Sequence, residues 1–177
     1  MDSPLAHREG RVAVRTTDLQ FLLDFDAWAN EQVLSIASGL TADEFVAVPG
    51  LGHAAPRSTV LHCINGMRLW RNRLEGTPIS APATEQEFPT LDSVRALWRA
   101  EHALFVTYVR GLTGEDLDAV LEQRRPDLVR SERWLLILHI VLHNVQHRSE
   151  LAQALTLLGH SPGELGLTAF MRRSTGE

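Results

Sequence analysis

The sequence predicts an all-α fold, a four-helix bundle with long connections between its helices. Four segments carry apolar residues at helical spacing, Gly- and Pro-rich stretches separate them, and 44% of the 177 residues are hydrophobic. A convincing alternating strand pattern is absent, apart from short candidate pieces at residues 46–48 or 117–121. We expect one domain over residues 16–171, with flexible tails at residues 1–15 and 172–177. Long connections permit crossovers, so the helices need not follow a simple up-down order.

Residues 18–38 form the first predicted helix, with Thr17 as its N-cap and Gly39 as its end. Its apolar residues are Leu19, Leu22, Leu23, Phe25, Trp28, Ala29, Val33, Leu34 and Ile36. Residues 59–74 form the second predicted helix, which follows Ser58 and ends at a stretch rich in Gly and Pro. Its apolar residues are Val60, Leu61, Ile64, Met67, Leu69, Trp70 and Leu74.

Residues 91–112 form the third predicted helix, which begins after Thr90 as a capping residue. Its inward-facing residues are Val94, Leu97, Trp98, Leu104, Phe105 and Tyr108. Residues 132–158 form the fourth and longest predicted helix, which stops at Gly159. The four segments together account for the predicted bundle.

The overall charge of the chain argues against a nucleic-acid-binding protein. The formal net charge is −5, whereas such proteins usually carry a basic domain or stripe. The longest apolar stretch, residues 134–142, is too short to span a bilayer, and the first residues lack the apolar core of a signal peptide. One cysteine, Cys63, excludes an intramolecular disulfide and the cysteine-rich zinc sites. We therefore expect a cytoplasmic protein without membrane or nucleic-acid partners.

Three histidines lie four residues apart in the fourth predicted helix, in the stretch LHIVLHNVQHRSE at residues 138–150. Residues four apart project from one helical face, so His143 and His147 have the spacing at which two imidazoles bind one metal ion. His139 continues the series, but it lies about 12 Å along the axis from His147, too far for one shared ion. Asn144 stands where the metalloprotease motif has glutamate, so a protease is not predicted. The alternative is that these histidines are ordinary core or surface residues.

A third metal ligand would have to come from another helix, and His62 in the second predicted helix is the candidate. It lies among apolar positions, where a histidine without a partner is costly to bury. Helical bundles build metal sites from side chains on facing helices. Three imidazoles leave a fourth coordination position open, which is typical of a catalytic site for zinc, nickel or a related divalent ion.

Several short motifs in this chain resemble those of the DinB/YfiT-like superfamily. The last long helix of that family typically reads H-V-V-N-H-x-x-H-H-R-G-Q. The corresponding stretch of this chain keeps His139, Val141, His143, His147 and Arg148. The stretch STVLHCINGMRLWRNRLEG is similar to the family block S-x-x-x-x-H-x-x-x-x-E-x-x-W, and a Trp-Ala-Asn triplet matches in the first helix. The resemblance covers residues 17–171.

The resemblance implies a four-helix bundle, often a homodimer, with a divalent metal ion held by His62, His143 and His147. Some family members are transferases or isomerases that use a low-molecular-weight thiol, and others have no established reaction. The chain departs from the family pattern beside the ligands, for example at Gln146, and lacks the glutamate usual after the second-helix ligand. No departure removes a ligand, but the changes alter the surroundings that select a substrate.

Four further residues are candidates for substrate binding or for supporting the ligands. Arg148 could bind an anionic substrate, or pair with an acid such as Glu150. Glu150 and His102 could support the ligands or act as a general base, and the simpler alternative is that they are ordinary helix residues. His139 is expected to pack or form hydrogen bonds at the end of the bundle. Cys63 points about 100° away from the preceding histidine, so packing is expected rather than catalysis.

The sequence therefore predicts a metal-dependent transferase or hydrolase of small molecules, thiol-dependent if the family's chemistry applies. A reactive small electrophile would be its substrate, in stress or detoxification. The alternative is a metal-binding bundle without catalytic activity, because no convincing general base accompanies the histidines. DNA binding has only the family's name in its favour, and the negative net charge disfavours it.

Overall fold

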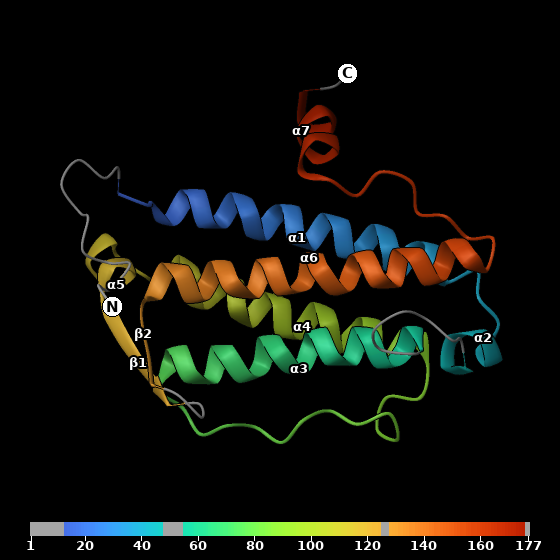
Figure 1. Ribbon diagram of the computed structural model, residues 1–177, viewed down its shortest axis with the longest axis horizontal. Coiled ribbons are helices and arrows are strands. Elements are labelled where there is room, and N and C mark those ends of the chain that lie inside the picture. Colours follow the sequence, from blue (N-terminus) through green and yellow to red (C-terminus); the bar gives the residue numbers. More distant parts are fainter. Residues whose placement is uncertain (1–12, 48–54, 125–127, 176–177) are drawn as a thin grey trace.

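The computed structural model describes residues 13–47, 55–124 and 128–175. Four long helices form a bundle, as Figure 1 shows: α1 (Thr16–Ala37), α3 (Pro56–Glu75), α4 (Leu91–Arg110) and α6 (Arg133–Leu157). The shorter elements are α2 (Ala42–Ala47), α5 (Gly114–Asp118), α7 (Leu167–Thr175) and an antiparallel hairpin of β1 (Val120–Arg124) and β2 (Leu128–Glu132). The all-α prediction is confirmed, and the hairpin is a small addition at one end of the bundle.

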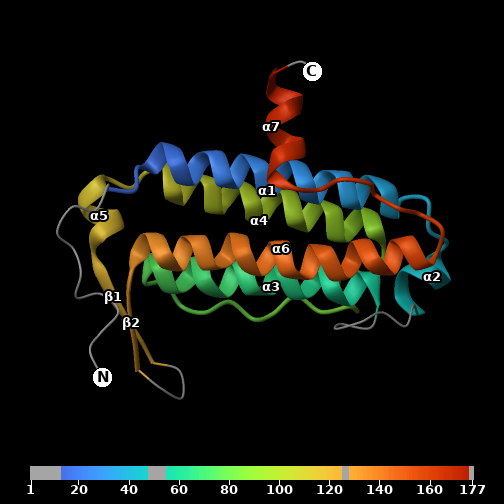
Figure 2. The same ribbon diagram turned by 45° about the horizontal axis from the view of Figure 1, so that its top comes forward.

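The four long helices do not follow a simple up-down order. Helix α1 packs against α4 and α6, and α3 packs against the same two helices. Helices α1 and α3 are therefore diagonally opposite in the bundle, as are α4 and α6, an arrangement visible in Figure 2. The connections from α1 to α3 and from α4 to α6 cross between diagonal positions, which explains why they are long. Among the described helices, none is long and apolar enough to cross a membrane.

The helix ends agree only partly with the sequence prediction. Thr90 caps α4 as predicted, because its hydroxyl accepts a hydrogen bond from the backbone N–H of Ser93 at 3.2 Å. The predicted caps Thr17 and Ser58 are wrong, because both residues already lie within their helices. Helix α3 begins at Pro56. Proline is favoured in the first helical turn, because the N–H groups there have no hydrogen-bond partner within the helix.

The short elements correct the prediction at three places. Residues 46–47 belong to α2, not to a strand, and residue 48 lies outside the described residues. Leu117 belongs to α5, whereas the strand that follows begins at Val120. Helix α7 includes residues 172–175, which the sequence assigned to a tail. Residues 1–12 of the predicted N-terminal tail lie outside the described residues.

Helix α7 projects from the side of the bundle beside α1, as both views show (Figures 1 and 2). Phe170 attaches it there, with its ring centroid 5.6 Å from Phe21, 6.0 Å from Phe25 and 5.6 Å from Trp28. Aromatic pairs at such separations contribute about 0.5–1.5 kcal/mol beyond their buried area. The C-terminal segment is thus attached to the outer face of α1 by one aromatic cluster.

The core of the bundle is apolar with a few polar exceptions. Large side chains that are almost fully buried include Phe105, Leu34, Ile64, Met67 and Ile137. Burying one side chain of this size contributes about 1.5–3 kcal/mol. Asp26 is also completely buried, together with Asn144 and Arg148. These polar exceptions lie beside the histidines of α6 and belong to the site.

Candidate metal centre

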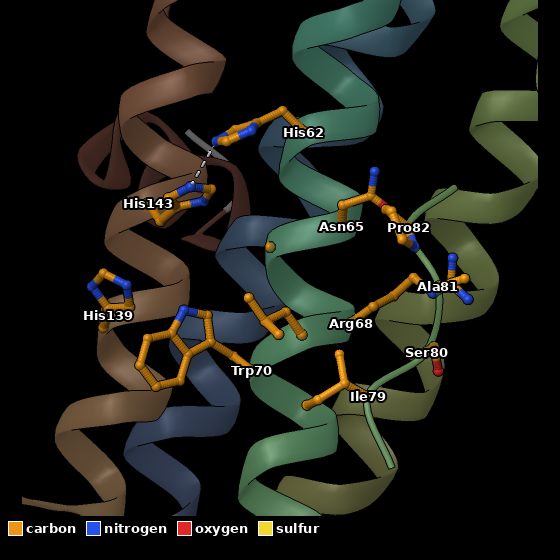
Figure 3. Close-up of a pocket in the computed structure, with 12 residues that line it drawn as sticks. His62, Asn65, Arg68, Trp70, Ile79, Ser80, Ala81, Pro82, His139 and His143 are labelled. Carbon is orange, nitrogen blue, oxygen red and sulfur yellow. Dashed lines mark hydrogen bonds between the residues drawn. The ribbon is translucent and has the colours of Figure 1, made fainter. Parts of the chain in front are cut away.

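The three predicted ligands meet between α3 and α6. His62 belongs to α3, whereas His143 and His147 belong to α6, and one ligand nitrogen of each lies within 4.8 Å of the other two. Nε2 of His62 is 3.2 Å from Nε2 of His143, and Figure 3 shows these two rings turned toward one another. The ring centroid of His147 is 4.5 Å from that of His62 and 4.5 Å from that of His143.

This donor set fits a divalent metal ion. Zinc binds histidine at about 2.0–2.1 Å, which places two nitrogens of a tetrahedral site about 3.3 Å apart. The His62–His143 pair already has this separation, and the ligand nitrogen of His147 lies within 4.8 Å of both. Imidazole nitrogens suit zinc, nickel and related ions. The cluster of three could therefore hold one ion.

The surroundings of His143 keep its imidazole neutral. Burial is the largest cause, followed by the neighbouring histidines 147, 62 and 139, and together they lower the pKa of His143 to about 4. A neutral imidazole retains the lone pair that a metal ion requires. At neutral pH, His143 is therefore in the protonation state that coordination needs.

An acid one turn along α6 orients His147. Nδ1 of His147 lies 2.7 Å from Oε2 of Glu150, and the histidine is buried. When Nδ1 donates its proton to the carboxylate, Nε2 keeps the lone pair for a metal ion. Pairing of a ligand histidine with a carboxylate is common at metal sites and fixes the tautomer of the ring. This geometry is the one that a supporting role of Glu150 requires, and the role itself stays a prediction.

A cavity of about 560 Å³ opens beside the histidines. Its walls come from α3, α6 and the connection at residues 79–82, and Figure 3 shows Trp70, Ile79 and Pro82 around it together with His62 and His143. Small-molecule sites typically have volumes of about 300–1,000 Å³ and mostly apolar walls. Among the described residues that line this cavity, there is no carboxylate and no thiol.

Two asparagines of α3 hold the connection that forms one wall of the cavity. The side-chain amide of Asn65 donates to the carbonyl of Ala83 at 2.9 Å and accepts from its N–H at 2.7 Å. Asn72 accepts from the N–H of Ser80 at 3.1 Å. Sequence reasoning missed both residues. Their spacing of two helical turns on one side of the helix was the available signal.

Another face of α6 carries a buried polar cluster. The carboxylate of Asp26, from α1, accepts hydrogen bonds from Asn144 at 2.8 Å and from Arg148 at 2.7 Å. The Arg148 guanidinium also lies 5.3 Å from the ring centroid of Phe25. Arg148 is 4% exposed, and it pairs with this interior acid. The sequence had suggested Glu150 or another surface acid as its partner. Sequence reasoning missed Asp26, although an acid within the apolar face of the first helix was a usable signal.

The other predicted residues lie around the cluster rather than in it. His139 is exposed on the cavity wall, with its ring edge-on to Trp70 at 5.1 Å, which agrees with the expected packing role. His102 lies on α4 against Trp98, and burial lowers its pKa. Cys63 is buried in the core, and burial raises the pKa of its thiol to about 12, so the structure agrees with packing rather than catalysis.

The fold and the site together define a class of protein, a helical bundle with a three-histidine cluster between two facing helices. The model of the DinB family matches residues 15–176, so the chain belongs to the DinB family. No curated protein matches the chain.

Solved structures show the same fold. A conserved protein of Enterococcus faecalis matches with a TM-score of 0.63 and 14% identity, over 83% of this chain and 99% of that one. A DinB family member from Shewanella denitrificans matches with a TM-score of 0.55 and 15% identity, over 86% of this chain and 89% of that one. At these identities, the similarity establishes the fold alone.

Proposed function

We propose that the protein binds one divalent metal ion through His62, His143 and His147 and acts as a metal-dependent transferase or hydrolase of small molecules. The observation that carries the proposal is that one ring nitrogen of each histidine lies within 4.8 Å of the other two, and that His62 and His143 also line a cavity of about 560 Å³. Three histidines leave a coordination position for water or substrate, and zinc and nickel both suit them. The ion would supply Lewis acidity and lower the pKa of a water or thiol in that position.

The residues of the chain would bind the substrate and exclude water. Leu69, Trp70 and Ile79 offer an apolar surface beside the histidines, so the substrate would place its apolar part there. Because no carboxylate or thiol lines the described part of the cavity, the nucleophile would be water or a low-molecular-weight thiol that enters as a second substrate. His139, outside the ligand set, is the titratable side chain on the wall that could exchange a proton with solvent.

The resemblance to the family extends the proposal in three directions. A reactive small electrophile is the proposed substrate, in a stress or detoxification role. A homodimer is the proposed assembly, and the cytoplasm is the proposed location. Each of these three statements rests on the sequence resemblance and on the composition of the chain.

A metal-binding bundle without catalytic activity is the second candidate. The observation that favours it is the same cavity lining, which offers no carboxylate or thiol as a general base among the described residues. In this case the ion would hold α3 to α6 and serve stability alone. The two candidates share the metal site and differ in whether a substrate reaches the ion.

Elemental analysis of the purified protein without a histidine tag tests the shared part of the proposal. We expect close to one zinc or nickel per chain in the parent, and loss of that metal in the double variant His143→Ala, His147→Ala. Absence of metal from both proteins, even after dialysis against divalent ions, would mean that the histidines are ordinary core residues.

A thiol-transfer assay separates the two candidates. The assay follows the formation of a thioether from a small thiol and chlorodinitrobenzene, in which the C–S bond forms, the C–Cl bond breaks, chloride leaves and the thiol proton goes to solvent. For the enzyme, we expect the metal-loaded parent to exceed the chelator-treated parent in rate. Equal rates across several thiols and ester substrates, with metal bound, would favour the non-catalytic candidate.

A further inference from the structure

We propose that Asp26 of α1 is a positioning residue for the metal centre, because it fixes the rotation of α6 that turns His143 and His147 toward His62. The inference rests on the proposed function, since it concerns how the proposed ligands are held. Asp26 lies on a helix that contributes no ligand, and it would act on the histidines only through α6.

Each of the two proposed ligands on α6, His143 and His147, is followed directly by a residue that binds this one carboxylate. Asn144 follows His143, and its Nδ2 donates to Oδ2 of Asp26 at 2.8 Å. Arg148 follows His147, and its Nη1 donates to Oδ1 of Asp26 at 2.7 Å. The two dipeptides are four residues apart, so the two bonds reach the two carboxylate oxygens from successive turns of α6.

This arrangement couples the two faces of α6. Adjacent helical residues point about 100° apart, so the histidine pair faces α3 while the Asn144–Arg148 pair faces α1. Two bonds from successive turns to one fixed group oppose both rotation and sliding of the helix. A ring nitrogen lies some 6 Å from the helix axis, so a rotation of about 20° would move it by about 2 Å. That shift equals a whole metal–nitrogen bond, so the ligands depend on this orientation.

The burial of this polar cluster indicates that it orients α6 as well as stabilising the fold. Asp26 is 0% exposed, Asn144 1% and Arg148 4%. Among the described residues, Oδ1 of Asn144 is buried without a hydrogen-bond partner. An unsatisfied buried oxygen lowers the stability of the folded chain, a cost that an apolar residue at this position would not carry. The amide therefore contributes its one directed bond to Asp26, and apolar packing could not replace that bond.

Cobalt binding followed by visible absorption tests the inference, because the spectrum of Co²⁺ reports the geometry of its ligands. The variants Asp26→Asn and Asn144→Ala each weaken the contact between α1 and α6. Glu31→Gln is the matched control: Glu31 is on the same helix, and its ion pairs are with Arg95 and Arg99 of α4, at 2.7 Å each. Circular dichroism establishes which proteins are folded before metal is added.

We expect the parent and Glu31→Gln to bind one Co²⁺ with the same affinity and spectrum. Asp26→Asn and Asn144→Ala should bind it about 10–100-fold more weakly, with altered absorption bands, as for other residues that orient ligands. Asn144→Ala retains the Arg148–Asp26 pair, so it decides the question if Asp26→Asn does not fold. Folded variants with the parent's affinity and spectrum would overturn this inference alone. A parent that binds no cobalt would overturn the proposed function, and this inference with it.

Discussion

Gly66 faces the ring of His143 where α3 and α6 meet. A Cβ atom added to Gly66 would lie 3.0 Å from Cε1 of His143, closer than such atoms normally approach. We therefore expect Gly66→Ala to displace the ring and to weaken zinc binding about tenfold, measured by competition with a chromophoric chelator. Gly114→Ala is the control, because a Cβ there meets no atom within 4 Å. Unchanged affinity in Gly66→Ala would show that His143 does not need its present position.

Glu31 gives a prediction about pH. Its hydrogen bond from Arg99, together with Arg95, lowers the pKa of Glu31 from 4.5 to about 2. A lowered pKa in the folded state contributes stability above pH 4.5, and this contribution is lost as the pH falls toward 2. Because Glu31 keeps 31% of its side chain exposed, Glu31→Gln should lower the free energy of unfolding at pH 7 by only about 0.5–1 kcal/mol. Urea denaturation should show this difference shrinking below pH 4.5; a difference that grows instead would contradict the assignment.

The three clustered histidines could be predicted from sequence because their signal is local. Two of them repeat at helical spacing, and the third stands out in an apolar segment. Asp26 and its partner Arg148 are 122 residues apart, so their contact exists only after α1 and α6 pack together. Contacts of this kind follow from tertiary structure, which spacing along one helix does not reveal. Arg148 was accordingly expected at a surface or a substrate, and it is buried.

At the scale of elements, α3 determines the cavity by binding both α6 and the connection that precedes α4. Asn65 makes two hydrogen bonds to Ala83, one as donor and one as acceptor. Asn65→Ala should therefore lower the free energy of unfolding by about 1–3 kcal/mol, because it leaves buried backbone groups without their partners. Urea denaturation measures this loss. A loss below 0.5 kcal/mol, within the range of ordinary surface substitutions, would mean that the connection does not depend on Asn65.

The long helices were predictable and the short elements were not. Each long helix spans several turns, so its apolar residues repeat often enough to establish the period. Helices α2 and α5 each extend for fewer than two turns, and the strands of the hairpin are equally brief, so their apolar residues do not establish a period. Helix starts were displaced by up to three residues, because several residues near a terminus can each act as a cap.

In the molecule as a whole, the proposed metal site joins two neighbouring helices that are far apart in sequence. An ion that binds the folded chain and not the unfolded chain raises stability by about 2.7 kcal/mol at a free concentration 100-fold above Kd. For a chain of this length, the melting temperature should then rise by roughly 5–11 °C. Differential scanning calorimetry of metal-free and zinc-loaded protein measures the shift, with His62→Ala as the control that should not respond. An equal shift in His62→Ala would place the ion elsewhere.

The bundle order makes this site depend on the long connections. Because α1 and α3 are diagonal, each contacts both α4 and α6, so α6 lies between the helix that carries His62 and the helix that carries Asp26. The sequence indicated that the connections are long enough to cross, and the structure shows which pairs they join. One face of α6 therefore meets His62, the proposed third ligand, while another meets the buried acid.

Anomalous diffraction from crystals grown with zinc, with data collected on both sides of the zinc absorption edge, would locate the metal ion itself. We expect one strong peak per chain, about 2.0–2.1 Å from a ring nitrogen of each of His62, His143 and His147, with a coordination position open to the cavity. A peak at other side chains, or no peak among these three histidines in zinc-saturated crystals, would contradict the proposed metal site.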